Sequence, residues 1–127
     1  MIILACIPAF NEGKVIGELI RDILQFVDKV IVCDDGSIDN TIIESEKAGA
    51  QVLKHKKNLG KGAAMKTLFN FLKNENFDAM ITIDGDRQFS PKEIPKLISP
   101  IVDEKMDIVI GYRSNKDEMP SYRKIGN

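Results

Sequence analysis

The sequence predicts an α/β fold with three layers, in which helices cover both faces of a doubly wound, mostly parallel sheet of the Rossmann-like kind. Two observations lead to this prediction. Short runs rich in Ile and Val, almost continuous in apolar character, alternate along the chain with longer segments whose apolar residues recur at helical spacing. Strands that are buried on both faces have the first pattern. The alternation of such strands with helices is typical of right-handed βαβ units.

Five short apolar runs are expected to be strands: Ile2–Ile7, Lys29–Cys33, Gln51–Lys54, Ala79–Ile83 and Ile108–Ile110. Helices are expected between them. Residues 15–27 place their apolar side chains on one helical face. The second helix is capped by Asp39-Asn40-Thr41 and closed by Gly49. The third spans residues 61–72, and the fourth begins with Ser90 as cap and Pro91 in the first helical position.

The composition is that of one soluble globular domain, with 43% hydrophobic and 29% charged residues in a chain of 127. The 18 basic and 19 acidic side chains give a formal net charge of -1. We expect no nucleic-acid partner, because such proteins normally carry a basic excess. No apolar run approaches the roughly 20 residues that span a bilayer. Cys6 and Cys33 are expected to be packed, reduced thiols of a cytoplasmic protein.

Polar clusters follow three of the expected strands. Because parallel strands all end at one edge of a sheet, these clusters are expected to gather at the edge where α/β sheets bind ligands. Carboxylates repel one another unless a cation or a donor-rich ligand lies among them. The sequence therefore predicts a metal-assisted site for a hydroxyl-rich, phosphorylated small molecule, built from Asn11, Glu12, Asp34, Asp35, Asp84 and Asp86.

The segment DDGSIDNT begins with two adjacent carboxylates, Asp34 and Asp35. Such a pair can accept hydrogen bonds from a nucleobase edge and from ribose hydroxyls. A capped strand-to-helix turn would explain Gly36, Ser37 and Asp39 without any ligand, but it would not explain the pair. We therefore predict a binding role for Asp34 and Asp35.

The segment DGDRQ places Asp84 and Asp86 one residue apart, with Gly85 giving close access to the backbone. In an extended backbone alternate side chains point the same way, so these carboxylates and Gln88 would face one cation. Oxygen ligands of this kind suit Mg²⁺ or Mn²⁺. We predict a divalent-cation site here.

The segment NLGKGAA has neither the spacing of a P-loop nor that of a dinucleotide fingerprint. It places Lys61 between two glycines at a helix N-terminus, a position that favours anions. Tight backbone packing with a solvated Lys61 is an equal alternative. The lysines before it are expected in solvent, and His55 is expected at the surface without a partner. Farther along, GYR ends the last strand, where Arg113 could pair with a diphosphate or be an ordinary surface arginine.

Taken in order, PAFNE, DDGSIDNT, NLGKGAA, DGDRQ and GYR resemble the family 2 glycosyltransferases of the GT-A fold, most closely the polyprenyl- and dolichol-phosphate sugar synthases. The resemblance implies an inverting transfer from a UDP- or GDP-linked sugar. It implies that a divalent cation is held by Asp84, Asp86 and Gln88, with Asp86 as the catalytic candidate. The whole predicted donor site comprises Pro8, Phe10, Asn11, Glu12, Asp34, Asp35, Lys61, Asp84, Gly85 and Arg113.

The resemblance also predicts how the chain is organised. Residues 1–113 would form the nucleotide-sugar-binding subdomain, and 114–127 a polar tail that leads to a missing acceptor-side segment. The implied acceptor is a lipid phosphate, which would make the protein peripheral to the cytoplasmic face of a membrane. An exposed sheet edge favours a homo-oligomer. Two alternatives are a non-catalytic nucleotide-binding module and a sugar-phosphate nucleotidyltransferase, although the latter normally has a Gly-rich, arginine-containing loop after the first strand.

Overall fold

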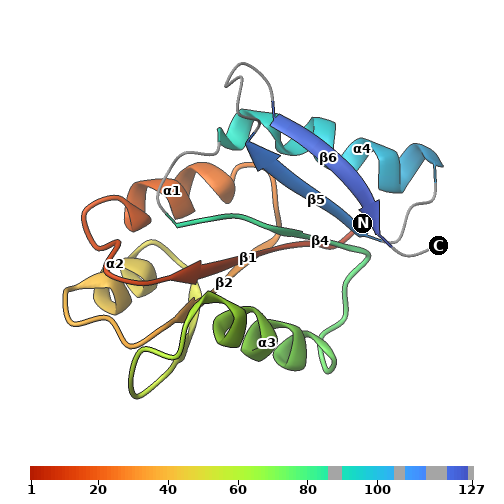
Figure 1. The fold of residues 1–127 in the computed structure, drawn as a ribbon. Helices are drawn as coiled ribbons and strands as arrows, with labels where there is room; N and C mark the ends of the chain where they lie inside the picture. The colour runs from red at the N-terminus through yellow and green to blue at the C-terminus, as the bar shows by residue number, and fades with distance from the viewer. Residues whose placement is uncertain (86–89, 105–107, 114–119, 126–127) are drawn as a thin grey trace.

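The computed structural model describes residues 1–85, 90–104, 108–113 and 120–125, and the side chains of residues 1–85 and 90–99. Strands and helices alternate as predicted (Figure 1). In chain order they are β1 (Ile3–Ala9), α1 (Ile16–Ile23), β2 (Lys29–Asp34), α2 (Thr41–Lys47), β3 (Gln51–Lys54), α3 (Lys61–Leu72), β4 (Ala79–Thr82), the 3₁₀ turn η1 (Pro91–Glu93), α4 (Ile94–Glu104), β5 (Ile108–Arg113) and β6 (Pro120–Ile125).

The central sheet has four parallel strands in the order β3-β2-β1-β4. The chain first moves outward from β1 to β2 and β3. It then returns through α3 to place β4 on the other side of β1. Strand order therefore reverses between β1 and β4, which confirms the predicted doubly wound sheet and defines its switch point.

Helices cover both faces of this sheet, as three layers require (Figure 1). Because successive strand residues point to opposite faces, β1 sends Ala5 and Ile7 into a core with α1 and α4, while Leu4 and Cys6 face α3. Each isoleucine or leucine that is fully buried in this way stabilises the fold by about 1.5–3 kcal/mol. Cys6 and Cys33 are buried and unbridged, as predicted.

The second sheet differs from the prediction. Strand β5 extends three residues beyond its predicted end and pairs with β6 in an antiparallel ladder, from Ile108 opposite Ile125 to Arg113 opposite Pro120. No strand is predicted at β6, because PSYRKI has neither an apolar run nor a clear alternation. The proposed boundary after residue 113 stays a prediction.

The predicted helix boundaries are partly confirmed: the N-cap residue of α2, Asn40, makes no side-chain capping bond, but Asp39 beside it does bond the first turn. Asp39 Oδ1 accepts a hydrogen bond from the Thr41 N–H at 3.0 Å, and Gly49 takes a positive φ of 104° just after α2. Ser90 precedes Pro91 as predicted, but its side chain makes no capping bond; its backbone oxygen accepts the N–H of Glu93 at 3.0 Å. In the described part of the chain no helix is long and apolar enough to cross a membrane.

Candidate functional site

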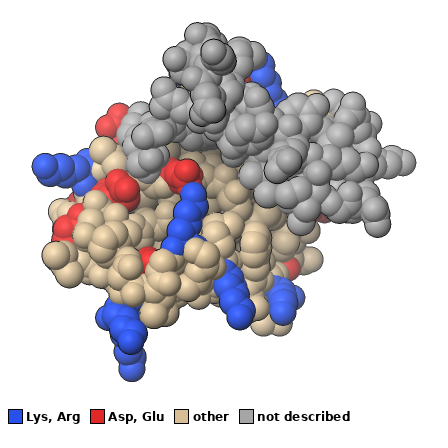
Figure 2. Space-filling view, in the orientation of Figure 1, with Lys and Arg blue, Asp and Glu red and all other residues tan. Residues whose placement is uncertain are grey.

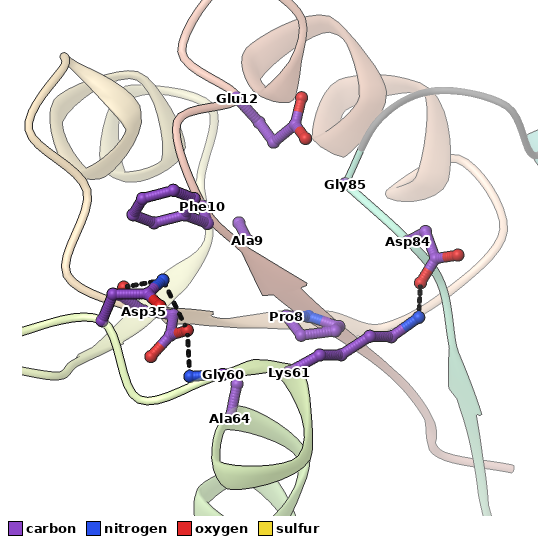
Figure 3. Close-up of a pocket in the computed structure, with 11 residues that line it drawn as sticks. Pro8, Ala9, Phe10, Glu12, Asp35, Gly60, Lys61, Ala64, Asp84 and Gly85 are labelled. Atoms are coloured by element: carbon purple, nitrogen blue, oxygen red, sulfur yellow. Dashed lines mark hydrogen bonds and ion pairs between the residues drawn. The ribbon is translucent and has the colours of Figure 1, made fainter.

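A pocket of about 520 Å³ opens at the carboxyl ends of β1, β2 and β4, beside the first turn of α3 (Figure 3). It therefore lies at the switch point, where α/β sheets bind ligands. Its walls mix apolar and charged groups: Pro8, Ala9, Phe10, Glu12, Asp35, Asn58, Gly60, Lys61, Ala64, Asp84 and Gly85.

Most of the predicted site residues that the structure describes meet in this pocket. They are Pro8, Phe10, Glu12, Asp35, Lys61, Asp84 and Gly85. Asn11 and Asp34 do not line it. Asp86 and Gln88 lie outside the described residues, and Arg113 ends β5 but its side chain is also outside them.

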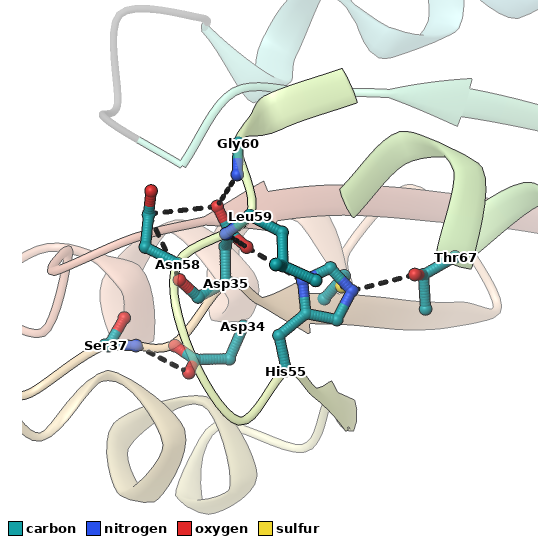
Figure 4. A network of polar contacts seen from close by, with 9 residues as sticks. Asp34, Asp35, Ser37, His55, Asn58, Leu59, Gly60 and Thr67 are labelled. Atoms are coloured by element: carbon teal, nitrogen blue, oxygen red, sulfur yellow. Dashed lines mark hydrogen bonds and ion pairs between the residues drawn. The ribbon is translucent and has the colours of Figure 1, made fainter. Parts of the chain in front are cut away.

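Asp35 is the most heavily bonded carboxylate of the site (Figure 4). Its Oδ1 accepts from the Leu59 N–H at 2.9 Å and contacts His55 Nδ1 at 2.8 Å. Its Oδ2 accepts from the Gly60 N–H at 2.9 Å and from Asn58 Nδ2 at 3.0 Å. A carboxylate offers about four acceptor positions, so protein groups occupy all of them. Asp35 therefore fixes the backbone that leads into α3.

These hydrogen bonds govern the ionisation of Asp35. The carboxyl is only 4% exposed, and burial alone would raise its pKa. The donors from Leu59, His55 and Gly60, together with attraction to the His55 ring, outweigh burial and lower the pKa of Asp35 below its ordinary value. The site thus holds a stable negative charge in the pocket wall.

The prediction for His55 is wrong. Its side chain is 9% exposed and lies between Asp35 and Thr67, whose Oγ1 is 2.8 Å from Nε2. Strand register explains the position: Asp34 pairs with Lys54, so the residues that follow, Asp35 and His55, come side by side. Alignment of the ends of β2 and β3 in the sequence would have given this signal.

Cys33 lies next to the same ring, with its Sγ 3.6 Å from His55 Nε2. Burial, followed by the negative charges of Asp35 and Asp34, raises the pKa of Cys33 to about 11. A thiol that stays protonated at neutral pH is a poor nucleophile. The contact with Cys33 is thus a further buried contact of the His55 ring.

Asp34 and Asp35 separate in the fold, although the sequence predicts that they act together. Asp34 is 1% exposed, and its Oδ2 accepts the Ser37 N–H at 3.0 Å. Its Oδ1 is buried without a hydrogen-bond partner among the described residues. The bond to Ser37 gives Asp34 a role in the turn after β2, which neither interpretation of this segment predicts.

Asn11 joins two loops beside the pocket. Its N–H donates to Ser37 Oγ at 2.8 Å, and its Oδ1 accepts the Ile38 N–H at 3.0 Å. Asn11 takes a positive φ of 53°, which asparagine tolerates better than most residues. Gly36 has a φ of 77°, and a Cβ there would lie 2.4 Å from the carbonyl carbon of Lys57. The loops after β1, β2 and β3 are thus held in close contact.

Lys61 reaches across the pocket to Asp84, with Nζ 2.6 Å from Oδ1 (Figure 3). Both side chains are well exposed, 65% for Lys61 and 58% for Asp84. A Cβ at Gly60 or Gly62 would meet nothing within 4 Å, so tight backbone packing does not explain the two glycines. Of the two interpretations of this segment, the structure favours the one in which Lys61 belongs to a binding site.

Asp84 presents an exposed carboxylate to the pocket, which suits a hard divalent cation. A side chain at Gly85 would not clash, because its Cβ would lie at ordinary van der Waals distance, 3.4 Å, from Glu12 Cγ, Ile7 Cγ2 and Ile16 Cδ1. Within residues 1–85 and 90–99 no group of three or more His, Cys, Asp or Glu side chains is arranged to hold a metal. The described residues therefore supply one predicted ligand, and the other two fall in 86–89.

Basic side chains do not gather on the face in Figure 2, where the Lys and Arg of the described residues stand apart from one another. Lys56 and Lys57 are exposed, as predicted.

A doubly wound sheet with a polar pocket at its switch point is the arrangement of α/β nucleotide-binding proteins. Within that class, residues 4–125 match the model of glycosyl transferase family 2, and the chain belongs to this family. The five sequence motifs and the family match agree over nearly the whole chain.

Curated relatives include an uncharacterized protein of Methanocaldococcus jannaschii, MJ1222, which is 37% identical over 98% of this chain and 54% of its own length. The UDP-N-acetylglucosamine--dolichyl-phosphate N-acetylglucosaminyltransferase of Methanococcus voltae is 32% identical over 95% of this chain and 57% of its own length. The chain thus spans about half the length of these relatives.

Among solved structures, glucosyl-3-phosphoglycerate synthase from Mycobacterium tuberculosis in complex with UDP has a TM-score of 0.72 and 29% identity, covering 90% of this chain and 45% of that one. The same enzyme with Mn²⁺, UDP and glucosyl-3-phosphoglycerate has a TM-score of 0.65 and 29% identity, over 80% of this chain and 40% of that one. The fold is therefore that of the GT-A glycosyltransferases.

Proposed function

We propose that this chain is the donor-binding part of an inverting glycosyltransferase that takes a UDP-linked sugar with a divalent cation. The observation that carries the proposal is the pocket at the switch point. It is lined by the exposed ring of Phe10, the hydrogen-bonded carboxylate of Asp35, Lys61 and the exposed carboxylate of Asp84. Family membership and the UDP complexes of structural neighbours support it, and those complexes favour UDP over GDP.

The base and ribose would lie between β1 and the start of α3. Phe10 is 44% exposed on the pocket wall, so its ring is accessible for stacking against a nucleobase. Pro8 and Glu12 line the same wall. Asp35 would help by fixing the loop over the base, because its own acceptor positions are occupied by protein donors.

The diphosphate would lie toward β4. Asp84, with Asp86 and Gln88, would hold Mg²⁺ or Mn²⁺, and Arg113 would add positive charge; neighbours with Mn²⁺ or Mg²⁺ and UDP support this arrangement. A bound cation supplies Lewis-acid stabilisation of charge on the departing diphosphate. Lys61 lies at the N-terminus of α3, where the helix favours anions, and would contact the same diphosphate.

The acceptor would be a lipid phosphate. Relatives are named as a dolichyl-phosphate transferase and as dodecaprenyl-phosphate galacturonate synthase. A phosphate oxygen is already ionised at neutral pH, so transfer to it needs no general base. Residues 1–113 would then be the donor subdomain, and the protein would work at the cytoplasmic face of a membrane. Self-association through the outer edge of β3 is a separate prediction that sedimentation can check.

Calorimetric titration tests the donor site. UDP and GDP are titrated into the chain with Mn²⁺ and then with EDTA. We expect UDP to bind with Mn²⁺ and to lose most of its affinity with EDTA, with Asp84→Ala and with Asp86→Ala. Glu46→Ala is the matched control, because Glu46 is an exposed carboxylate on α2, away from the pocket lining. Equal UDP affinity with and without metal would refute the cation role, and no nucleotide binding would refute the donor site.

A further inference from the structure

The ion pair between Lys61 and Asp84 spans the mouth of the pocket and engages a carboxylate that the proposed function assigns to the cation. We propose that Lys61 is a built-in competitor of the divalent cation: it neutralises Asp84 while the donor is absent and leaves Asp84 for the donor diphosphate when the donor binds. This inference rests on the proposed function and adds a positioning role for Lys61.

The geometry of α3 allows this exchange. Lys61 is the first residue of the helix, and the Gly60 N–H before it is held by Asp35 at 2.9 Å. The backbone of this segment is therefore fixed. The lysine side chain is a flexible four-carbon stem with a single charged end, and it is 65% exposed. The ammonium group can change partners without any movement of the helix.

The two cations exclude each other at Asp84. Lys61 Nζ is already 2.6 Å from Oδ1, and a Mg²⁺ ligand distance is about 2.0–2.1 Å. Two positive groups on one carboxylate repel strongly at such separations. Because the pair is exposed it is weak, so a divalent ion can displace Lys61 but must compete with it.

A bound diphosphate removes Lys61 from Asp84. It offers Lys61 a doubly charged partner at the helix N-terminus, and Asp84 then becomes available to the cation. Binding of the diphosphate therefore raises the affinity for the cation, and binding of the cation raises the affinity for the diphosphate. Both effects act through Lys61, and such a reciprocal change in affinity is coupled binding. The consequence is that the nucleotide-free chain holds a cation loosely and the nucleotide-loaded chain holds it tightly.

The test compares Mn²⁺ affinity without nucleotide in the parent, Lys61→Met and Lys57→Met, measured by calorimetry. Lys57 is an exposed lysine of the preceding loop and serves as the matched control. We expect Lys61→Met to bind Mn²⁺ about two- to fivefold more tightly, as the loss of an exposed ion pair implies, and Lys57→Met to match the parent. In an Asp84→Asn background the substitution at Lys61 should have no effect.

A second measurement follows Lys61 itself. In spectra of the 13C-labelled chain, the Lys61 Cε signal should shift toward the values of mobile lysines when Mg²⁺ is added, and shift again when UDP is added. The Lys57 signal should stay in place. An unchanged Lys61 signal at saturating Mg²⁺, or an unchanged Mn²⁺ affinity in Lys61→Met, would overturn the competition while leaving the donor site intact. Failure of Mn²⁺ to bind even with UDP would overturn the proposed function, and the competition with it.

Discussion

The Nδ1 atom of His55 lies 2.8 Å from Oδ1 of Asp35, and this buried contact joins the loop after β3 to the end of β2. Asp35 in turn holds the N–H groups of Leu59 and Gly60 at the entrance to α3. One wall of the pocket is therefore supported by a pair that a ligand need not touch. The position of Lys61 depends on this support.

Replacement of His55 tests the support directly. His55→Phe keeps a ring but removes both nitrogen contacts, leaving Asp35 and Thr67 short of a partner. We expect the free energy of unfolding to fall by about 1–3 kcal/mol, the cost of buried polar groups left unsatisfied, and UDP to bind more weakly. Urea denaturation measures the first effect. The exposed neighbour provides the control, since Lys56→Ala should stay within about 0.5 kcal/mol of the parent. Equal stability of parent and His55→Phe would contradict the structural role.

Asp35 predicts a pH dependence of stability. Its pKa in the folded chain lies below the ordinary value of 3.8 for an aspartate. The ionised form is therefore favoured by folding, and its contribution is complete above pH 3.8 and is lost as pH falls through the lower folded pKa. Asp35→Asn should be less stable at neutral pH, and the difference from the parent should shrink in acid. Denaturation curves across the acid range measure it, and a difference that does not change with pH would contradict the assignment.

Three glycines form a graded series. Gly36→Ala combines a φ of 77° with a Cβ 2.4 Å from the Lys57 backbone and should cost about 2–5 kcal/mol. Gly60→Ala has a φ of 101° and a ψ of 160° but open space and should cost about 1–3 kcal/mol. Gly62→Ala lies in α3 with open space and should be neutral or stabilise by up to about 1 kcal/mol. Thermal or urea unfolding gives the order, and a different order would contradict the loop geometry.

Phe10 and Phe69 offer a matched pair for the donor site. Both rings are 44% exposed, but only Phe10 of the two lines the pocket, while Phe69 lies on α3 outside the lining. Phe10→Ala should weaken UDP binding by about 1–3 kcal/mol, the value of a base stacked on an aromatic ring, and Phe69→Ala should leave it unchanged. Calorimetric titration with Mn²⁺ measures both. Equal affinities of the two variants would show that the base does not stack on Phe10.

The sequence predicted the pocket because its signal is local. Each wall follows a short apolar run, and parallel strands bring the ends of such runs together. Asp84 was found in this way, whereas Lys61 was found from its place between two glycines at a helix N-terminus and Phe10 from the family resemblance. The second sheet was missed at β6, where PSYRKI carries no periodic pattern.

The sequence analysis did not foresee the bond between Asp34 and Ser37 or the burial of His55. Neighbouring residues at a strand end point to opposite sides, so Asp34 turns to Ser37 while Asp35 turns to the His55 side. The position of His55 needs the strand register between β2 and β3, which is a tertiary fact, whereas the bond from Ser37 to Asp34 is local to the turn. Taken separately, the two sequence segments show only a pair of adjacent carboxylates and a single histidine.

The crossover from β3 through α3 to β4 determines when the binding site can exist. Phe10 and Asp84 follow β1 and β4, two strands that become neighbours only after this crossover has closed, and closing such a long-range contact is slow because of its entropic cost. A chain opened at β4 loses the phosphate end of the pocket while β1 and β2 still pair. A nucleotide that bridges both ends therefore stabilises the completed sheet by mass action, and its binding would report on the integrity of the whole domain.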